Sequence, residues 1–85
     1  MRDELIEQAI LQTLHNRGCG AKERTLRNEV AIRLDRPLMP LTDFEDALNR
    51  LSAREAVKRE VTELGTPLWG ITSLGRQMMT EEGWL

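Results

Sequence analysis

The sequence predicts a single α+β domain over residues 1–85, in which three helices precede a two-stranded β-hairpin and a short C-terminal helix. Three observations carry this prediction. Apolar residues recur at helical spacing in the first part of the chain, alternate with charged residues further on, and are separated by turn residues. With 40% hydrophobic and 31% charged residues, the chain has enough apolar side chains for one small core.

The first helix is predicted over residues 3–17. Asp3 is suited to cap its N-terminus, and Gly18 is suited to end it. The residues at helical spacing on its inner face are Leu5, Ile6, Ala9, Ile10, Thr13 and Leu14.

The second helix is predicted over about residues 25–34, after a glycine turn and a short extended segment at 21–24. Thr25 is its expected N-cap, because a threonine hydroxyl can accept a hydrogen bond from the first turn. Ile32 points away from the inner face, and the sequence offers no reason for its position. The apolar stripe on the inner face consists of Leu26, Val30 and Leu34.

The third helix is predicted from a capping box and an apolar stripe, and it is expected to end near Arg54. In the capping box, Thr42 is the N-cap and Glu45 follows three residues later. The apolar stripe consists of Phe44, Ala47, Leu48 and Leu51.

The hydrophobic period then changes from helical spacing to two. Residues 57–61 alternate apolar and charged side chains, which predicts a strand. Residues 64–67 form a turn and residues 68–72 a second strand, so the two strands make a hairpin. The Thr-Ser pair at 72–73 is suited to cap a last short helix over about 74–80.

Two short motifs and the order of the elements resemble a known family. Leu48-x-x-Leu51, followed by Val57 in a strand, is similar to the family's third helix and first wing strand. Residues 69–76, WGITSLGR, resemble its wing exit: an aromatic residue, a β-branched residue, Thr, two more residues, Gly and a basic residue. The family is the winged helix-turn-helix superfamily, and the resemblance covers nearly the whole chain. It implies a small DNA-binding protein, a transcriptional regulator, whose third helix (about 42–54) enters the major groove.

The third helix carries residues with the chemistry for base contacts, on and beside the side opposite its apolar stripe. Asparagine can pair with adenine through two atoms, and arginine can do the same with guanine. The expected base-facing residues are Asn49, Arg50 and Arg54. Basic residues before and within the second helix and in the hairpin suit phosphate contacts. The expected phosphate-facing residues are Arg24, Arg27 and Lys58.

The same helix also carries evidence for a different function. Its first turns contain Asp43, Glu45 and Asp46, the chain has a net charge of −2, and like charges repel phosphate. Acids in a first turn also complement the helix dipole, which accounts for them without any ligand. The alternative hypothesis is therefore a winged-helix protein–protein interaction module that binds no DNA and places its acidic third helix against a basic partner.

The composition gives little support for catalysis or cofactor binding. The chain has one histidine, one cysteine and no tyrosine, so we expect no enzyme, no metal and no cofactor. His15 and Cys19 lie four residues apart, but two ligands do not make a zinc site. No apolar run is long enough for a membrane span, and the N-terminus resembles no signal peptide, so we expect a cytoplasmic protein with no membrane contact.

Apolar residues near both chain ends raise the question of assembly. Leu11 lies off the main stripe of the first helix, and Met79 and Trp84 exceed what a short last helix must bury. Interfaces are enriched in Trp and Met, and operator-binding proteins of this kind are commonly dimers. The sequence thus predicts a homodimer through the first helix and the tail. In the alternative interpretation, Trp84 folds back onto the first helix of its own chain.

Overall fold

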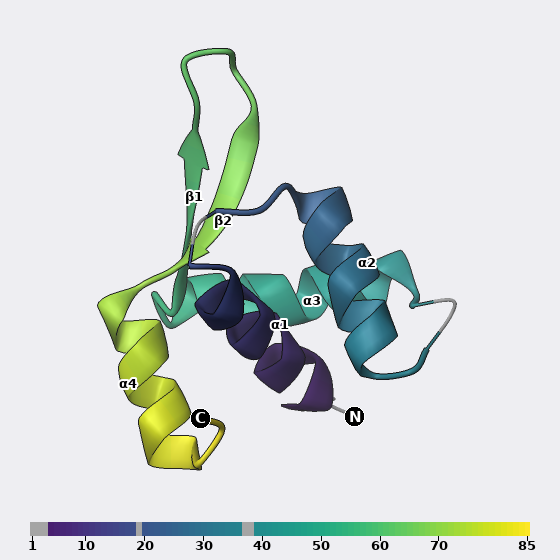
Figure 1. Ribbon diagram of the computed structural model, residues 1–85, viewed down its shortest axis with the longest axis vertical. Coiled ribbons are helices and arrows are strands. Elements are labelled where there is room, and N and C mark those ends of the chain that lie inside the picture. The colour runs from purple at the N-terminus through teal and green to yellow at the C-terminus, as the bar shows by residue number, and fades with distance from the viewer. Residues whose placement is uncertain (1–3, 19, 37–38) are drawn as a thin grey trace.

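The computed structural model describes residues 4–18, 20–36 and 39–85. It is an α+β arrangement in which a hairpin projects from a body of helices (Figure 1). The predicted order of three helices, a hairpin and a last helix is confirmed. The elements are α1 (Glu4–Arg17), α2 (Glu23–Arg33), α3 (Leu41–Ala53), β1 (Val57–Val61), β2 (Pro67–Ile71) and α4 (Ser73–Glu82).

Helix α1 lies at the centre of the helical body and contacts α2, α3, α4 and β2. Its predicted inner face is buried except for Leu5, which is 53% exposed, so the prediction is wrong at that residue. Leu11, which was predicted to lie off this face, is fully buried. Leu11 therefore belongs to the core and offers no surplus apolar surface for a dimer. The helix ends at Gly18, which has a φ of 69° and whose N–H donates to Leu14 O at 3.3 Å. The predicted cap at Asp3 lies outside the described residues.

Helix α2 begins two residues before its predicted start, so the prediction of Thr25 as N-cap is wrong. The N-cap is Lys22, which makes no side-chain capping bond. The β-bridge before it is limited to Ala21, whose N–H donates to Trp69 O at 2.9 Å and whose carbonyl accepts from Trp69 N–H at 2.7 Å. Because this bridge holds the chain beside β2, α2 begins only two residues later, at Glu23. Ile32 is 79% exposed, in agreement with its predicted outward direction.

Helix α3 has the predicted apolar stripe but a different N-terminus. All four stripe residues are buried. The N-cap is Pro40, whereas Thr42 lies within the first turn, so the predicted capping box is wrong. Proline suits the start of a helix because its φ is already fixed near the helical value and its missing N–H is not needed there. The helix closes at Arg54, and Glu55 follows with a φ of 59°.

The hairpin is anchored at its base and exposed at its tip. Val57 is buried and Ile71 packs against the core, whereas Val61 is 62% and Leu64 94% exposed. The second strand starts one residue earlier than predicted. The register pairs Val57 with Ile71, Lys58 with Gly70, Arg59 with Trp69, Glu60 with Leu68 and Val61 with Pro67.

Helix α4 starts at the predicted threonine cap. Thr72 Oγ1 accepts a hydrogen bond from Gly75 N–H at 3.0 Å and donates one to Glu55 O at 2.6 Å. Gly75 packs directly against the backbone carbonyl of Ala56, so that a Cβ atom at this position would collide with it. The helix runs to Glu82, two residues beyond the prediction. The close approach gives the glycine of the WGITSLGR motif a structural reason.

The tail returns to its own chain. Met79 is buried, and Trp84 is half-buried and packs against the core. Gln12 Nε2 donates a hydrogen bond to Trp84 O at 2.9 Å, which fixes the tail on α1. Two of the three residues behind the predicted tail-mediated homodimer are thus core residues, and the third contacts the core. Among the described residues, no helix is long and apolar enough to cross a membrane.

Candidate functional site

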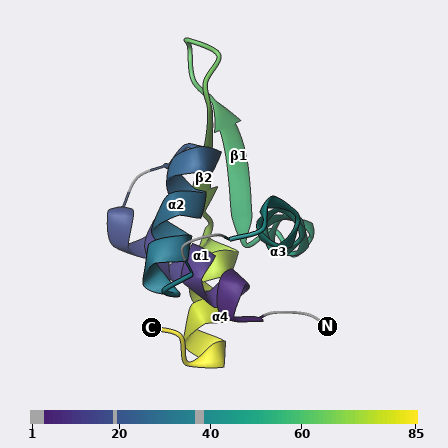
Figure 2. The ribbon, with the colours of Figure 1, turned by 90° about the vertical axis from the view of Figure 1, so that its right-hand side faces the viewer.

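Helix α3 presents its polar side to solvent because its apolar stripe holds it against α1. Figure 2 shows α3 end-on, at one side of the molecule and beside the foot of β1. Asp43, Asp46 and Asn49 are exposed on this helix, and Glu45 is half-buried. The exposed charged side chains of α3, Asp43 and Asp46, are thus both carboxylates, and they lie among the uncharged Thr42, Asn49 and Ser52.

Arg50, one of the expected base-facing residues, lies toward the interior side of this arrangement and faces α1. Its Nε lies 3.5 Å from Oε1 of Glu7 on α1, and the Glu7 side chain is fully buried. The Arg50 side chain is only 34% exposed. A buried carboxylate needs a compensating charge, so Arg50 neutralises Glu7. The sequence signal for this pair was Glu7 itself, an acid at helical spacing from Ile10 and Leu14.

The other two expected base-facing residues remain available. Asn49 is exposed on the outer side of α3, and Arg54 is exposed at its C-terminal cap. Within the described residues, neither side chain has a hydrogen-bond or ion-pair partner. They do not share one face, because a separation of five positions corresponds to a rotation of about 140° around the helix axis.

The expected phosphate-facing residues are not gathered on one surface. Arg24 is exposed and Arg27 half-buried, both on α2, whereas Lys58 lies on β1. In Figure 2, α2 and α3 appear on opposite sides of the foot of the hairpin. Lys58 Nζ is 2.8 Å from Glu60 Oε1, and both side chains are exposed. This ion pair reduces the positive charge that the hairpin can offer to a phosphate.

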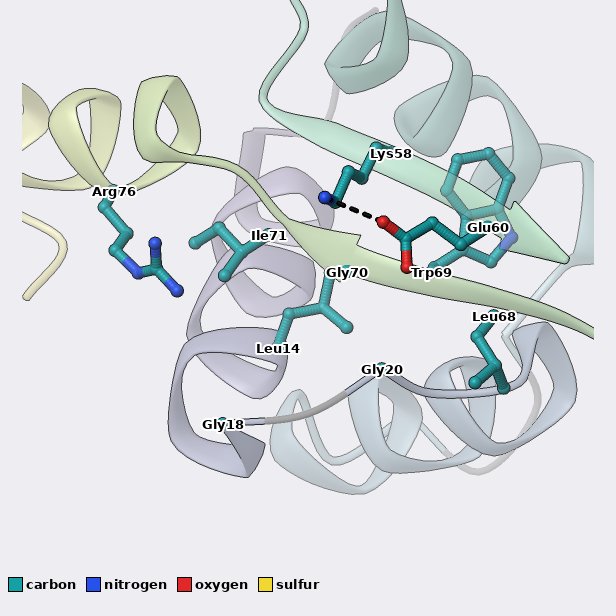
Figure 3. A pocket seen from close by; sticks show the side chains of 10 residues that line it. All are labelled: Leu14, Gly18, Gly20, Lys58, Glu60, Leu68, Trp69, Gly70, Ile71 and Arg76. Atoms are coloured by element: carbon teal, nitrogen blue, oxygen red, sulfur yellow. Dashed lines mark ion pairs between the residues drawn. The ribbon is translucent and has the colours of Figure 1, made fainter. Parts of the chain in front are cut away.

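A cavity of about 230 Å³ lies between the hairpin and the C-terminal end of α1 (Figure 3). Its charged lining residues are Lys58, Glu60 and Arg76, and Gly70 contributes no side chain. Figure 3 shows Lys58 and Glu60 paired over the sheet and Arg76 extending from α4. Lys58 is already paired with Glu60, so Arg76 is the one lining cation, among the described residues, that has no carboxylate partner. In the described ranges, no group of three or more His, Cys, Asp or Glu side chains is placed to hold a metal ion.

Comparison with protein-family models, with curated proteins and with solved structures finds no match to this chain. The candidate site therefore depends on the geometry and charge of α3, α2 and the hairpin alone.

Proposed function

We propose that the chain is a winged-helix interaction module, and that the outer face of α3 together with the hairpin binds a Lys/Arg-rich segment of a partner protein. The observation that carries this proposal is the charge of that face. Its exposed charged side chains, Asp43 and Asp46, are both acidic. Arg50 and Lys58 beside it are each paired with a carboxylate, whereas Arg54 at its C-terminal end is exposed and has none among the described residues.

The arrangement of the elements supports the winged-helix part of the proposal. Three helices precede the hairpin, and Ala21 pairs with β2 on the side away from β1, in the position of a short additional strand. The capping bond from Gly75 to Thr72 and the contact of Gly75 with Ala56 give structural roles to two residues of the wing-exit motif. In this layout α3 is the recognition helix and the hairpin is the wing.

The charge of α3 favours a protein partner over duplex DNA. A recognition helix that enters a groove comes within a Debye length of the phosphates, about 8–10 Å, where like charges repel. Asp43 and Asp46 are exposed at the end of α3 where such contacts are expected. A Lys/Arg-rich segment would instead be attracted by both carboxylates. Such attraction mainly increases the specificity and the rate of association.

Exposed apolar side chains on α3 and on the hairpin also suit a protein partner. Leu41 is exposed in the first turn of α3, and Val61 and Leu64 are exposed in the hairpin. Such groups contribute nothing to phosphate contacts, whereas protein interfaces bury them at their centres. The expected partner segment therefore combines basic residues with a few apolar ones.

Duplex DNA is the second candidate. Arg24 and Arg54 favour it, since both are exposed and neither has a carboxylate partner among the described residues. Asn49 adds one side chain able to read adenine. In this alternative the acids of α3 serve only to complement the helix dipole.

Fluorescence anisotropy separates the two candidates. We expect a labelled Lys/Arg-rich peptide with interspersed leucines to bind, and a labelled duplex of mixed sequence not to bind at low salt. Asp46→Lys should weaken peptide binding about tenfold or more, since it replaces an attraction by a repulsion. The control Glu82→Lys makes the same charge change at an exposed site at the end of α4 and should leave binding unchanged.

The opposite result would favour DNA. If the native chain binds the duplex, and if log affinity falls by about 0.9 per contacted phosphate with each decade of salt, the acidic face is no barrier and the protein-partner proposal fails.

A further inference from the structure

Gly70 is the one glycine of the chain that neither the backbone nor the packing explains. It lies inside β2, where glycine destabilises a strand, and it pairs with Lys58 in an unbroken register, so that no bulge accounts for it. Its φ is not positive, and a Cβ atom at this position would meet no atom within 4 Å. The others adopt a positive φ or lie tightly against a neighbouring residue: Gly18, Gly65 and Gly83 in the first case, and Gly20 and Gly75 in the second.

The space beside Gly70 belongs to the cavity between the hairpin and the C-terminal end of α1 (Figure 3). Lys58 lies opposite Gly70 in the register and Glu60 lies opposite Leu68, so these four residues share one face of the hairpin. All four line the cavity. A glycine inside a strand often marks a place where a ligand approaches the backbone closely. The open space over Gly70 therefore indicates room for a ligand.

The lining of this cavity combines one available cation with an apolar wall. Lys58 Nζ and Glu60 Oε1 are 2.8 Å apart, so these two charges compensate each other. The Arg76 side chain is exposed and has no carboxylate partner among the described residues. In Figure 3 its guanidinium lies at one end of the cavity, beside Ile71, and Gly70 lies nearer the middle. The apolar part of the lining consists of Leu14, Leu68 and Ile71.

We propose that this cavity binds a small organic carboxylate with a compact apolar body, whose carboxylate pairs with Arg76 and whose body lies against Gly70. A planar guanidinium can hold a carboxylate through two parallel N–H···O hydrogen bonds. Glu60 in the same lining repels anions, which favours a singly charged ligand over a phosphate. The volume of about 230 Å³ is below the roughly 300–1,000 Å³ of most ligand pockets, so the ligand must be small. This proposal does not depend on the proposed function of α3.

The backbone of Gly70 suits the apolar part of such a ligand. Trp69 gives both its N–H and its carbonyl to Ala21, on the side away from β1. Because the direction of these groups alternates along a strand, those of Gly70 point toward β1 and Lys58. The surface that Gly70 presents to the cavity is therefore its Cα atom and the faces of its two peptide units. A flat apolar ring can lie against that surface without leaving a polar group unpaired.

Isothermal titration calorimetry with benzoate tests the site, because benzoate joins one carboxylate to a flat apolar ring. We expect saturable binding to the native chain with a dissociation constant of about 1 mM or below. Benzamide has the same shape without the charge and should bind about tenfold or more weakly, and acetate has the charge without the ring and should also bind more weakly. A native chain that does not bind benzoate, or that binds benzamide or acetate as tightly, would overturn the proposal.

Arg76→Gln removes the charge but keeps a hydrogen-bonding side chain, and it should weaken benzoate binding about tenfold or more. Arg24→Gln is the matched control. Arg24 is also exposed and without a carboxylate partner among the described residues, but it lies on α2 and does not line the cavity. This control should bind benzoate as the native chain does. Equal weakening in the two variants would mean that benzoate responds only to the overall charge, and the proposal would fail.

Substitution of Gly70 tests the space itself. Gly70→Ala and Gly70→Val should both fold, because a Cβ atom at this position meets no neighbour and valine favours strands. Alanine should weaken benzoate binding severalfold, and valine should abolish it. Circular dichroism checks that each variant is folded, and the alanine variant carries the test if the valine variant is not. Benzoate binding of native strength in the folded variants would place the ligand elsewhere and overturn the proposal.

Discussion

The C-terminal helix with its tail and the β-hairpin both carry large apolar side chains, but the ends of the two segments differ in how far these are buried. Met79 and Trp84 follow the hairpin in sequence and pack onto the core, whereas Val61 and Leu64 remain largely exposed. The difference lies in the available neighbours. Helix α4 has α1 to pack against, while the upper part of the hairpin extends past the helices (Figure 1). Apolar content alone therefore does not say whether a segment belongs to the core.

The largest expected difference between these regions is in side-chain truncation. Met79→Ala should lower the free energy of unfolding by about 2–5 kcal/mol, because it leaves a cavity beside α1. Leu64→Ala removes a similar volume at the hairpin tip and should change stability by less than about 0.5 kcal/mol. Urea unfolding of the two variants measures both values. Equal losses would mean that the hairpin tip is buried in solution, for example against another molecule.

The two glycines of the WGITSLGR motif provide a second contrast. Gly75→Ala should lower the free energy of unfolding by about 1–3 kcal/mol, since its Cβ would collide with the carbonyl of Ala56. Gly70→Ala meets no atom within 4 Å and restricts the unfolded chain, so it should stabilise by about 0.4–1 kcal/mol. Thermal unfolding followed by circular dichroism gives the sign of each change. A stabilising Gly75→Ala would show that α4 is not seated on the turn before β1.

The smallest expected effect concerns the attachment of the tail. Gln12→Ala removes the hydrogen bond to Trp84 O and should cost about 0.5–1.5 kcal/mol of unfolding free energy. It should leave the oligomeric state unchanged, because the tail contacts its own chain. Light scattering on Gln12→Ala and on a chain truncated after Glu82 tests this second expectation. Dissociation of a dimer in either variant would restore the tail as the subunit contact.

Local patterns predicted most of the fold. The stripe of α3 was found residue by residue, because its members are spaced so that burial of one face requires them all. The predicted starts of α2 and α3 are wrong, because neither helix begins at a residue whose side chain caps it. Ala21 is held by β2, and Pro40 begins α3 without any side-chain cap.

The candidate site was less predictable than the fold. The ion pair of Arg50 with Glu7 is not predictable from local sequence, because Glu7 is far away in the chain and meets Arg50 only through the packing of α3 on α1. The pairing of Lys58 with Glu60 is predictable from the sequence, since alternate residues of a strand share one face. The exposure of Asn49 and Arg54 agrees with the wheel of α3 but leaves their function as a proposal.

The position of the aromatic residues gives the protein a built-in optical probe. It has two tryptophans and no tyrosine, with Trp69 in β2 and Trp84 beyond α4. Both are half-buried against the core, so unfolding moves each indole into water and alters its emission. Variants that retain one tryptophan each would report on the hairpin and the tail separately. Coincident fluorescence transitions would show that the two regions unfold as one cooperative unit.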